Sequence, residues 1–74
     1  MAPPTTKQIE IVVNGHVRLA PEGYTLRELL VWLEVDPERV AVELNRSIVQ
    51  RQAWNQTIVG TGATLEIVQF VGGG

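Results

Sequence analysis

The chain has 74 residues, of which 45% are hydrophobic, and it contains no cysteine. This length allows one small domain, and the lack of cysteine excludes a disulfide framework, a thiolate metal site and a cysteine nucleophile. Six basic and eight acidic residues give a net charge of −2, and the basic residues are dispersed, which disfavours nucleic-acid binding.

The chain also lacks the sequence features of a membrane or secreted protein. No apolar stretch approaches the length of a membrane span, and the first residues lack the charged and apolar segments of a secretory signal. We therefore expect a cytoplasmic protein with no membrane partner. Its expected parts are a disordered extension over residues 1–7, a folded domain over 8–71 and a flexible tail over 72–74.

The first elements predicted along the chain form a β-hairpin. Apolar and polar residues alternate over residues 8–13, which indicates a strand. Asn14-Gly15 follows, and this pair favours a type I′ turn because both central residues of that turn need a positive φ. A second strand is expected over 17–20, and Pro21-Glu22-Gly23 then ends it.

A helix is predicted to begin after Thr25. Thr25 is a suitable N-cap residue, and Glu28 lies three residues later, where it completes a capping box. Tyr24 and Leu29 occupy the two positions of a hydrophobic staple. Leucines then recur with the spacing of one buried helix face, at Leu26, Leu29, Leu30 and Leu33.

Pro37 limits the length of this helix, because a proline disfavours helical geometry in the residue before it. The helix is therefore expected to end near Glu34 or Val35. Residues 36–39 can form an isolated helical turn.

A short second hairpin is predicted next, with strands over 40–44 and 47–49 joined by a tight turn at Asn45-Arg46. Residues 50–56 are ambiguous, and a single helical turn anchored by Trp54 is the interpretation that we favour.

The final strand is predicted over 65–71, where β-branched and aromatic residues predominate. By alternation, Leu65, Ile67 and Gln69 share one face, while Glu66, Val68 and Phe70 share the other. One face must pack beneath the helix. The other face then either presents Val68 and Phe70 as an exposed patch for a partner, or the strand twists and buries Phe70.

The order of these elements predicts an α+β fold in which one helix covers one face of a mixed sheet. If the last strand lies beside the first and parallel to it, the arrangement is the β-grasp, or ubiquitin-like, fold. We expect four to five strands packed on one main helix.

The sequence offers no conventional catalytic or metal-binding site. His16 is the only histidine and lies beside a hairpin turn without an acidic partner, and Ser47 has no base to activate its hydroxyl. A solvated loop explains the acidic residues Glu34, Asp36 and Glu38, and packing explains Trp32 and Trp54. A turn explains Gly60-Thr61-Gly62, which is too short to cradle a phosphate group.

The last three residues, Gly72-Gly73-Gly74, have three interpretations: an added linker or a truncation, a frayed terminus, or a reactive tail. Glycines can enter a slot too narrow for side chains. Ordering such a tail costs on the order of 1–2 kcal/mol per residue, so affinity must come from the folded surface. A carboxylate condensed with ATP becomes an acyl-adenylate, which a sulfur or nitrogen nucleophile can attack. The chain would then be a substrate and carrier, not an enzyme.

The sequence as a whole resembles those of the ThiS family, the sulfur carriers of thiamine thiazole biosynthesis. The matching segments span nearly everything from Ile9 onward: Val13-Asn14-Gly15, residues 25–30, residues 40–45, Arg51 with Trp54, and residues 65–68 followed by Val71-Gly72-Gly73-Gly74. Two positions depart from the family pattern, since Ala63 replaces a usual acidic residue and Gln50 a usual proline. Both lie in predicted turns, where they concern local stability more than function.

The resemblance implies a β-grasp carrier without catalytic residues, a metal or a bound cofactor of its own. Gly74 would be the site of covalent attachment. A ThiF-like, E1-related adenylyltransferase would adenylate it with MgATP, sulfur derived from cysteine would convert it to a thiocarboxylate, and a ThiG-like thiazole synthase would receive the sulfur. The remaining implied site residues are Gly72 and Gly73, which would thread the partner's active site, and Val68, Phe70 and Val71, which would dock.

Other functions remain open at this point. A MoaD-like carrier of molybdopterin synthesis has the same chemistry, although those proteins usually carry prolines shortly before the diglycine, which residues 69–71 do not reproduce. Carriers for cysteine synthesis or tRNA thiolation are further alternatives. A non-covalent β-grasp adaptor with an incidental tail belongs to a different class.

Overall fold

The computed structural model describes residues 7–70, so most of the expected N-terminal extension, Val71 and the three terminal glycines lie outside the described residues. Lys7, the last residue of that expected extension, accepts a hydrogen bond at its C=O from the Glu22 N–H at 2.8 Å. Backbone contacts of the first hairpin therefore extend to Lys7.

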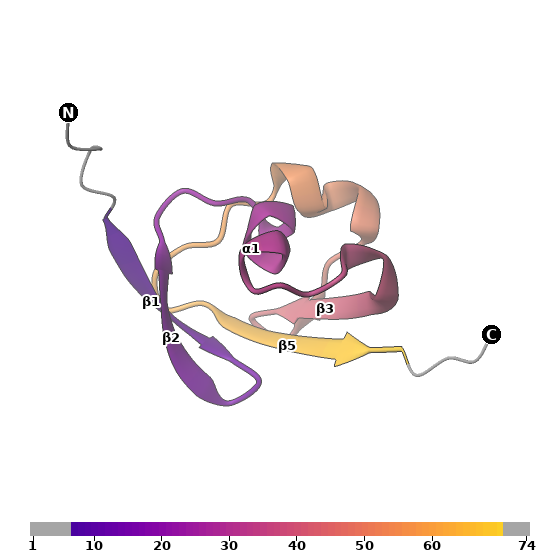
Figure 1. Cartoon of the computed structure of the whole chain (residues 1–74), viewed down its shortest axis with the longest axis horizontal. Helices are drawn as coiled ribbons and strands as arrows, with labels where there is room; N and C mark the ends of the chain where they lie inside the picture. The colour runs from indigo at the N-terminus through magenta and orange to yellow at the C-terminus, as the bar shows by residue number, and fades with distance from the viewer. Residues whose placement is uncertain (1–6, 71–74) are drawn as a thin grey trace.

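The described residues form a five-stranded mixed sheet with the order β2-β1-β5-β3-β4. Its strands are β1 (Gln8–Val13), β2 (His16–Pro21), β3 (Val40–Leu44), β4 (Ser47–Ile48) and β5 (Thr64–Gln69). β5 lies at the centre, parallel to β1 and antiparallel to β3 (Figure 1). The pairing of the last strand with the first, the condition stated above for a β-grasp arrangement, is thus present, and the expected fold class is confirmed.

One α-helix, α1 (Leu26–Trp32), covers one face of this sheet (Figure 1). Two short 3-10 helices, η1 (Pro37–Arg39) and η2 (Arg51–Gln56), complete the helical part. They correspond to the two isolated helical turns predicted from the sequence. Side chains of the helix, the sheet and the loops share one core: Ile9, Ile11, Ala20, Leu26, Leu29, Leu30, Val40, Val42, Trp54, Val59, Ala63 and Leu65.

Both hairpins close through two-residue turns, as predicted, and all four turn residues have a positive φ. Asn14 and Gly15 have φ values of 50° and 84°, and Asn45 and Arg46 have values of 52° and 72°. Asparagine is one of the few residues with a Cβ that adopts this conformation readily. The two turns therefore set the register of the strands that they join.

The N-terminus of α1 has the predicted capping box. The Thr25 hydroxyl accepts a hydrogen bond from the Glu28 N–H at 3.1 Å, and the Thr25 N–H donates to the Glu28 carboxylate at 2.9 Å. These reciprocal bonds satisfy two backbone donors that the helix itself cannot pair. The helix start is thus fixed by local sequence.

The C-terminus of α1 is a Schellman motif. The N–H groups of Glu34 and Val35 donate to the C=O groups of Val31 and Leu30, at 2.9 and 3.0 Å, which are the two bonds that define this motif. Glu34 has a φ of 63°, at a position where glycine is usual because it has no Cβ. The helix ends at Trp32, earlier than the downstream proline alone predicted.

Replacing Glu34 with glycine is expected to stabilise the fold by about 0.5–1 kcal/mol, because left-handed backbone is unfavourable for a residue with a Cβ. The midpoint of thermal unfolding should rise by about 4–8 °C per kcal/mol in a domain of this size. Glu34→Ala is the matched control, since it removes the same carboxylate but keeps a Cβ. An equal gain in both variants would show that the charge, and not the backbone, is responsible.

Candidate functional site

The candidate site lies at the end of β5, on the face of the sheet opposite α1. Along β5 and in the residue that follows it, Leu65 is buried and Ile67 is half-buried on the helix side, whereas Val68 and Phe70 are 60% and 54% exposed. The predicted alternation is therefore confirmed. Of the two alternatives for Phe70, the structure shows the exposed one.

Four exposed side chains form a continuous apolar surface here, which we call the outer patch: Ala41, Ile48, Val68 and Phe70. Ala41 lies opposite Val68 in the β3–β5 register. Ala41, Ile48 and Val68 line one hollow of about 80 Å³. Ala41 and Ile48 line a second hollow of about 170 Å³ with Phe70. The outer patch thus runs from β4 across β3 to the last described residue of the chain.

On the β3 side, the end of β5 is supported by η1. The Phe70 N–H donates to the Arg39 C=O at 2.7 Å. Asp36 caps η1 by accepting a hydrogen bond from the Glu38 N–H at 3.0 Å. The backbone position of Phe70 therefore depends on how η1 is held.

Arg51 connects η1 to η2. Its Nη1 donates to the Pro37 C=O at 2.9 Å and lies 3.3 Å from the Glu38 carboxylate. Its guanidinium carbon lies 5.2 Å from the centre of the Trp54 ring, within the range of a cation–π contact. Arg51 and Trp54, which also appear together among the segments that match the family, thus support η1, the helical turn to which the Phe70 backbone is bonded.

On the β1 side, the end of β5 is held by the side chain of Asn14. β1 ends at Val13, and the Asn14 N–H donates to the Leu65 C=O at 2.9 Å. Beyond that point, Asn14 Oδ1 accepts from the Ile67 N–H at 2.7 Å and Nδ2 donates to the Ile67 C=O at 3.2 Å. The Asn14 carboxamide therefore makes the hydrogen bonds to β5 that the next peptide group of β1 would make if that strand continued.

The first residue of β5 has a similar partner in the second hairpin turn. The Asn45 N–H donates to the Thr64 C=O at 2.8 Å, and Asn45 Oδ1 accepts from the Thr64 N–H at 3.0 Å. Sequence reasoning identified Asn14 and Asn45 only as turn residues. The available signal was the choice of asparagine, because a carboxamide carries both a donor and an acceptor, as a peptide group does.

The other residues considered in the sequence do not assemble into a catalytic site. His16 and Ser47 are exposed in different hairpins. Asp36 caps η1, and Glu38 lies within η1 and forms an ion pair with Arg51. Among residues 7–70, no group of three or more His, Cys, Asp and Glu side chains is placed to hold a metal ion. None of the helices in this range is long and apolar enough to cross a membrane.

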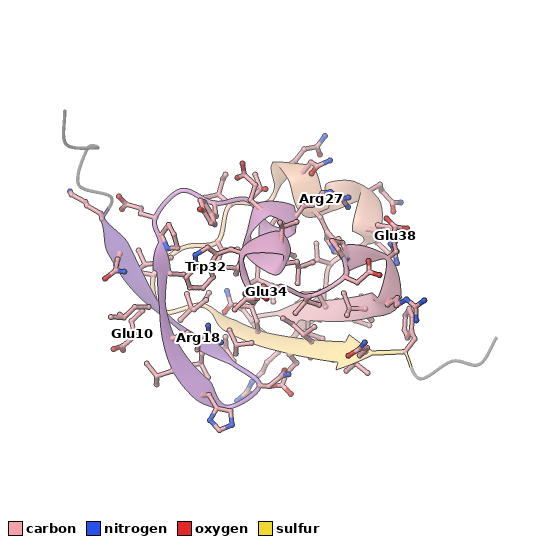
Figure 2. All side chains as sticks on the ribbon, in the orientation of Figure 1. Glu10, Arg18, Arg27, Trp32, Glu34 and Glu38 are labelled. Carbon is pink, nitrogen blue, oxygen red and sulfur yellow. The ribbon has the colours of Figure 1, made fainter. Side chains whose placement is uncertain are left out.

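The two tryptophans contribute to packing in different ways. Trp54 is buried, and its Nε1 donates to the Val49 C=O at 2.9 Å. Trp32 is partly exposed, and the Arg18 guanidinium carbon lies 5.6 Å from the centre of its ring (Figure 2). Trp32 thus lies at the edge between the helix and the β1–β2 hairpin.

Asn14→Gly is expected to loosen the end of β5, because glycine accepts the positive φ but has no carboxamide to pair with Ile67. Native-state hydrogen exchange should show faster exchange of the Ile67 amide, by about five- to tenfold for a lost bond of about 1 kcal/mol.

Asn45→Gly is the matched control for this experiment. It removes the corresponding bond at the start of β5, so it should expose the Thr64 amide and leave the protection of Ile67 nearly unchanged. Unchanged exchange of Ile67 in Asn14→Gly would contradict the role given to the carboxamide.

Comparison with protein families gives one match that covers almost the whole chain. The model of the ThiS family matches residues 6–74. This range includes the three C-terminal glycines as well as every element described above.

Individual proteins that are similar to this chain point to the same family. The sulfur carrier protein ThiS of Escherichia coli is 32% identical over 66 residues, which cover 89% of this chain and 100% of that protein. A crystal structure of the thiamine biosynthesis protein ThiS from Geobacter metallireducens superposes with a TM-score of 0.78 at 36% identity, covering 89% of this chain and 100% of that one.

A thiazole synthase of Paramagnetospirillum magneticum is also similar. It is 42% identical over 66 residues, or 89% of this chain. The chain spans only 20% of the length of that synthase.

Proposed function

The chain belongs to the ThiS family, the β-grasp sulfur carriers of thiamine biosynthesis, and on this basis we propose that its C-terminal glycine carboxylate carries sulfur as a thiocarboxylate. Members of this family are carriers and not catalysts, so partner enzymes supply the chemistry. The observation that carries the proposal is the extent of the family match, which includes Gly72-Gly73-Gly74.

The proposed chemistry begins with activation of Gly74. A carboxylate oxygen attacks the α-phosphorus of ATP in a ThiF-like adenylyltransferase that holds Mg²⁺, and pyrophosphate leaves. A hydrosulfide ion whose sulfur derives from cysteine then forms a C–S bond to the acyl carbon of the adenylate, AMP leaves with the electron pair of the broken C–O bond, and loss of a proton gives the thiocarboxylate. Gly72 and Gly73 suit this role because they can pass through a narrow active-site slot.

The proposed sulfur acceptor is a thiazole synthase. A stretch similar to this chain lies within a much longer thiazole synthase, which favours that acceptor over the MoaD-like route to molybdopterin. The family assignment to thiamine biosynthesis supports the same choice.

The outer patch is the proposed docking surface for these enzymes. Val68 and Phe70 are large, exposed and close to the tail in sequence, and Val71, which lies outside the described residues, would extend the contact. Exposed apolar side chains of this kind stabilise a complex when a partner removes them from water. The outer patch can thus supply the affinity that a tail of glycines, without side chains, lacks.

The thiocarboxylate proposal predicts a defined change in intact mass. After incubation with the adenylyltransferase, MgATP and a cysteine-derived sulfur source, the mass should rise by the difference between one sulfur and one oxygen. Deleting Gly74 or omitting ATP should abolish the change. An unchanged mass under conditions that thiolate the E. coli ThiS protein would favour a non-covalent adaptor instead.

The docking proposal predicts that Val68→Ala combined with Phe70→Ala raises KM for adenylation by about tenfold, which corresponds to about 1.4 kcal/mol of lost contact. The unfolding midpoint should change little, because both side chains are exposed. Val17→Ala is the control, since Val17 is 61% exposed on β2, away from the outer patch. An equal change in KM in the control would contradict a localised docking surface.

A further inference from the structure

Two carboxylates face each other on the outer face of the sheet. Glu43 of β3 and Glu66 of β5 are directly opposite in the antiparallel register, and both side chains are exposed. Like charges in this position destabilise a pair of strands. The ion pairs found within residues 7–70 involve other side chains, so neither of these carboxylates forms an ion pair there.

The two carboxylates also share a hollow with the outer patch. Glu43 and Glu66 line the hollow of about 80 Å³, together with Ala41, Ile48 and Val68. The hollow therefore combines apolar walls with two anionic groups. Lysine and arginine have the complementary form, an apolar stem that ends in a cation. A guanidinium can also donate hydrogen bonds to two carboxylates at once.

We propose that this hollow receives an arginine or lysine side chain of the adenylating enzyme, so that one charged contact and the apolar outer patch form a single docking surface. The proposal rests on the function proposed above, which supplies this partner. The cation would offset the repulsion between Glu43 and Glu66 in the complex, whereas the free chain retains it.

The adenylating enzyme is the partner to which we assign this contact. It acts on a glycine carboxylate, a group that many chains can offer, so it must select its substrate by the folded surface. A thiazole synthase can in addition recognise the thiocarboxylate itself. The need for recognition by surface charge is therefore greater in the adenylating step.

The proposal predicts opposite effects on stability and binding. Glu43→Gln and Glu66→Gln each remove one of the two like charges while keeping the size of the side chain. Each should raise the unfolding midpoint by about 1–5 °C. Each should also weaken binding to the adenylating enzyme by about three- to tenfold at low salt, mainly through slower association, and reduce its salt dependence. A purely structural role predicts only the change in stability.

Glu10→Gln is the matched control. Glu10 is exposed on the same face of the sheet but on β1, at the opposite side of the molecule from the end of β5 (Figure 2). Its neutralisation changes the net charge equally and should leave the Kd within about twofold of the wild-type value. An equal loss of affinity in Glu10→Gln would overturn the proposal, because the effect would then come from total charge.

Other outcomes would also overturn it. Wild-type affinity in both Glu43→Gln and Glu66→Gln would exclude the contact. Weaker binding to the thiazole synthase alone, or weaker self-association alone in sedimentation experiments, would assign the hollow to a different occupant.

Intact-mass measurements separate this inference from the proposed function. If the glutamine variants gain sulfur with the wild-type KM, only the charged contact is wrong. If the wild-type chain binds the enzyme but gains no sulfur, the thiocarboxylate proposal is wrong and the affinities still decide the docking contact. A wild-type chain that neither binds nor gains sulfur would overturn both.

Discussion

The parallel pairing of β5 with β1 is the constraint on which the rest of the structure depends. It brings a strand near the end of the chain between the two hairpins and places Leu65 in the core beneath α1. Direct strand pairing covers only Val12 with Thr64 and Val13 with Leu65, and the carboxamide of Asn14 extends it to Ile67. Through this extension, a turn residue of the first hairpin supports the strand that carries Val68 and leads to Phe70.

Local patterns in the sequence were sufficient for most of the fold. The hairpin turn at Asn14-Gly15 and the capping box of Thr25 and Glu28 each depend on a few neighbouring residues, so they could be predicted. The end of α1 was misplaced because the left-handed conformation of Glu34 has no glycine to mark it. The roles of Asn14 and Arg51 in supporting the site depend on contacts between distant segments, which periodicity and turn chemistry do not encode.

The two departures from the family pattern are accommodated by their surroundings. Ala63 is buried in the core, and its N–H donates to the Gly60 C=O at 3.2 Å. Gln50 is the N-cap of η2 with a φ of −65°, a value that proline also adopts. Both residues therefore fit their local backbone and leave the family assignment intact.

The position of β5 between β1 and β3 also has a mechanical consequence. Hydrogen bonds run perpendicular to the strands in an antiparallel pair and at a slant in a parallel pair, and β5 has partners along both of its edges. A pull on the chain beyond Phe70 along the axis of β5 would load these bonds in shear and nearly together, not one after another. An enzyme that draws the end of this chain into a narrow site would therefore meet a strand that resists extraction, and the pulling force would pass into both halves of the sheet.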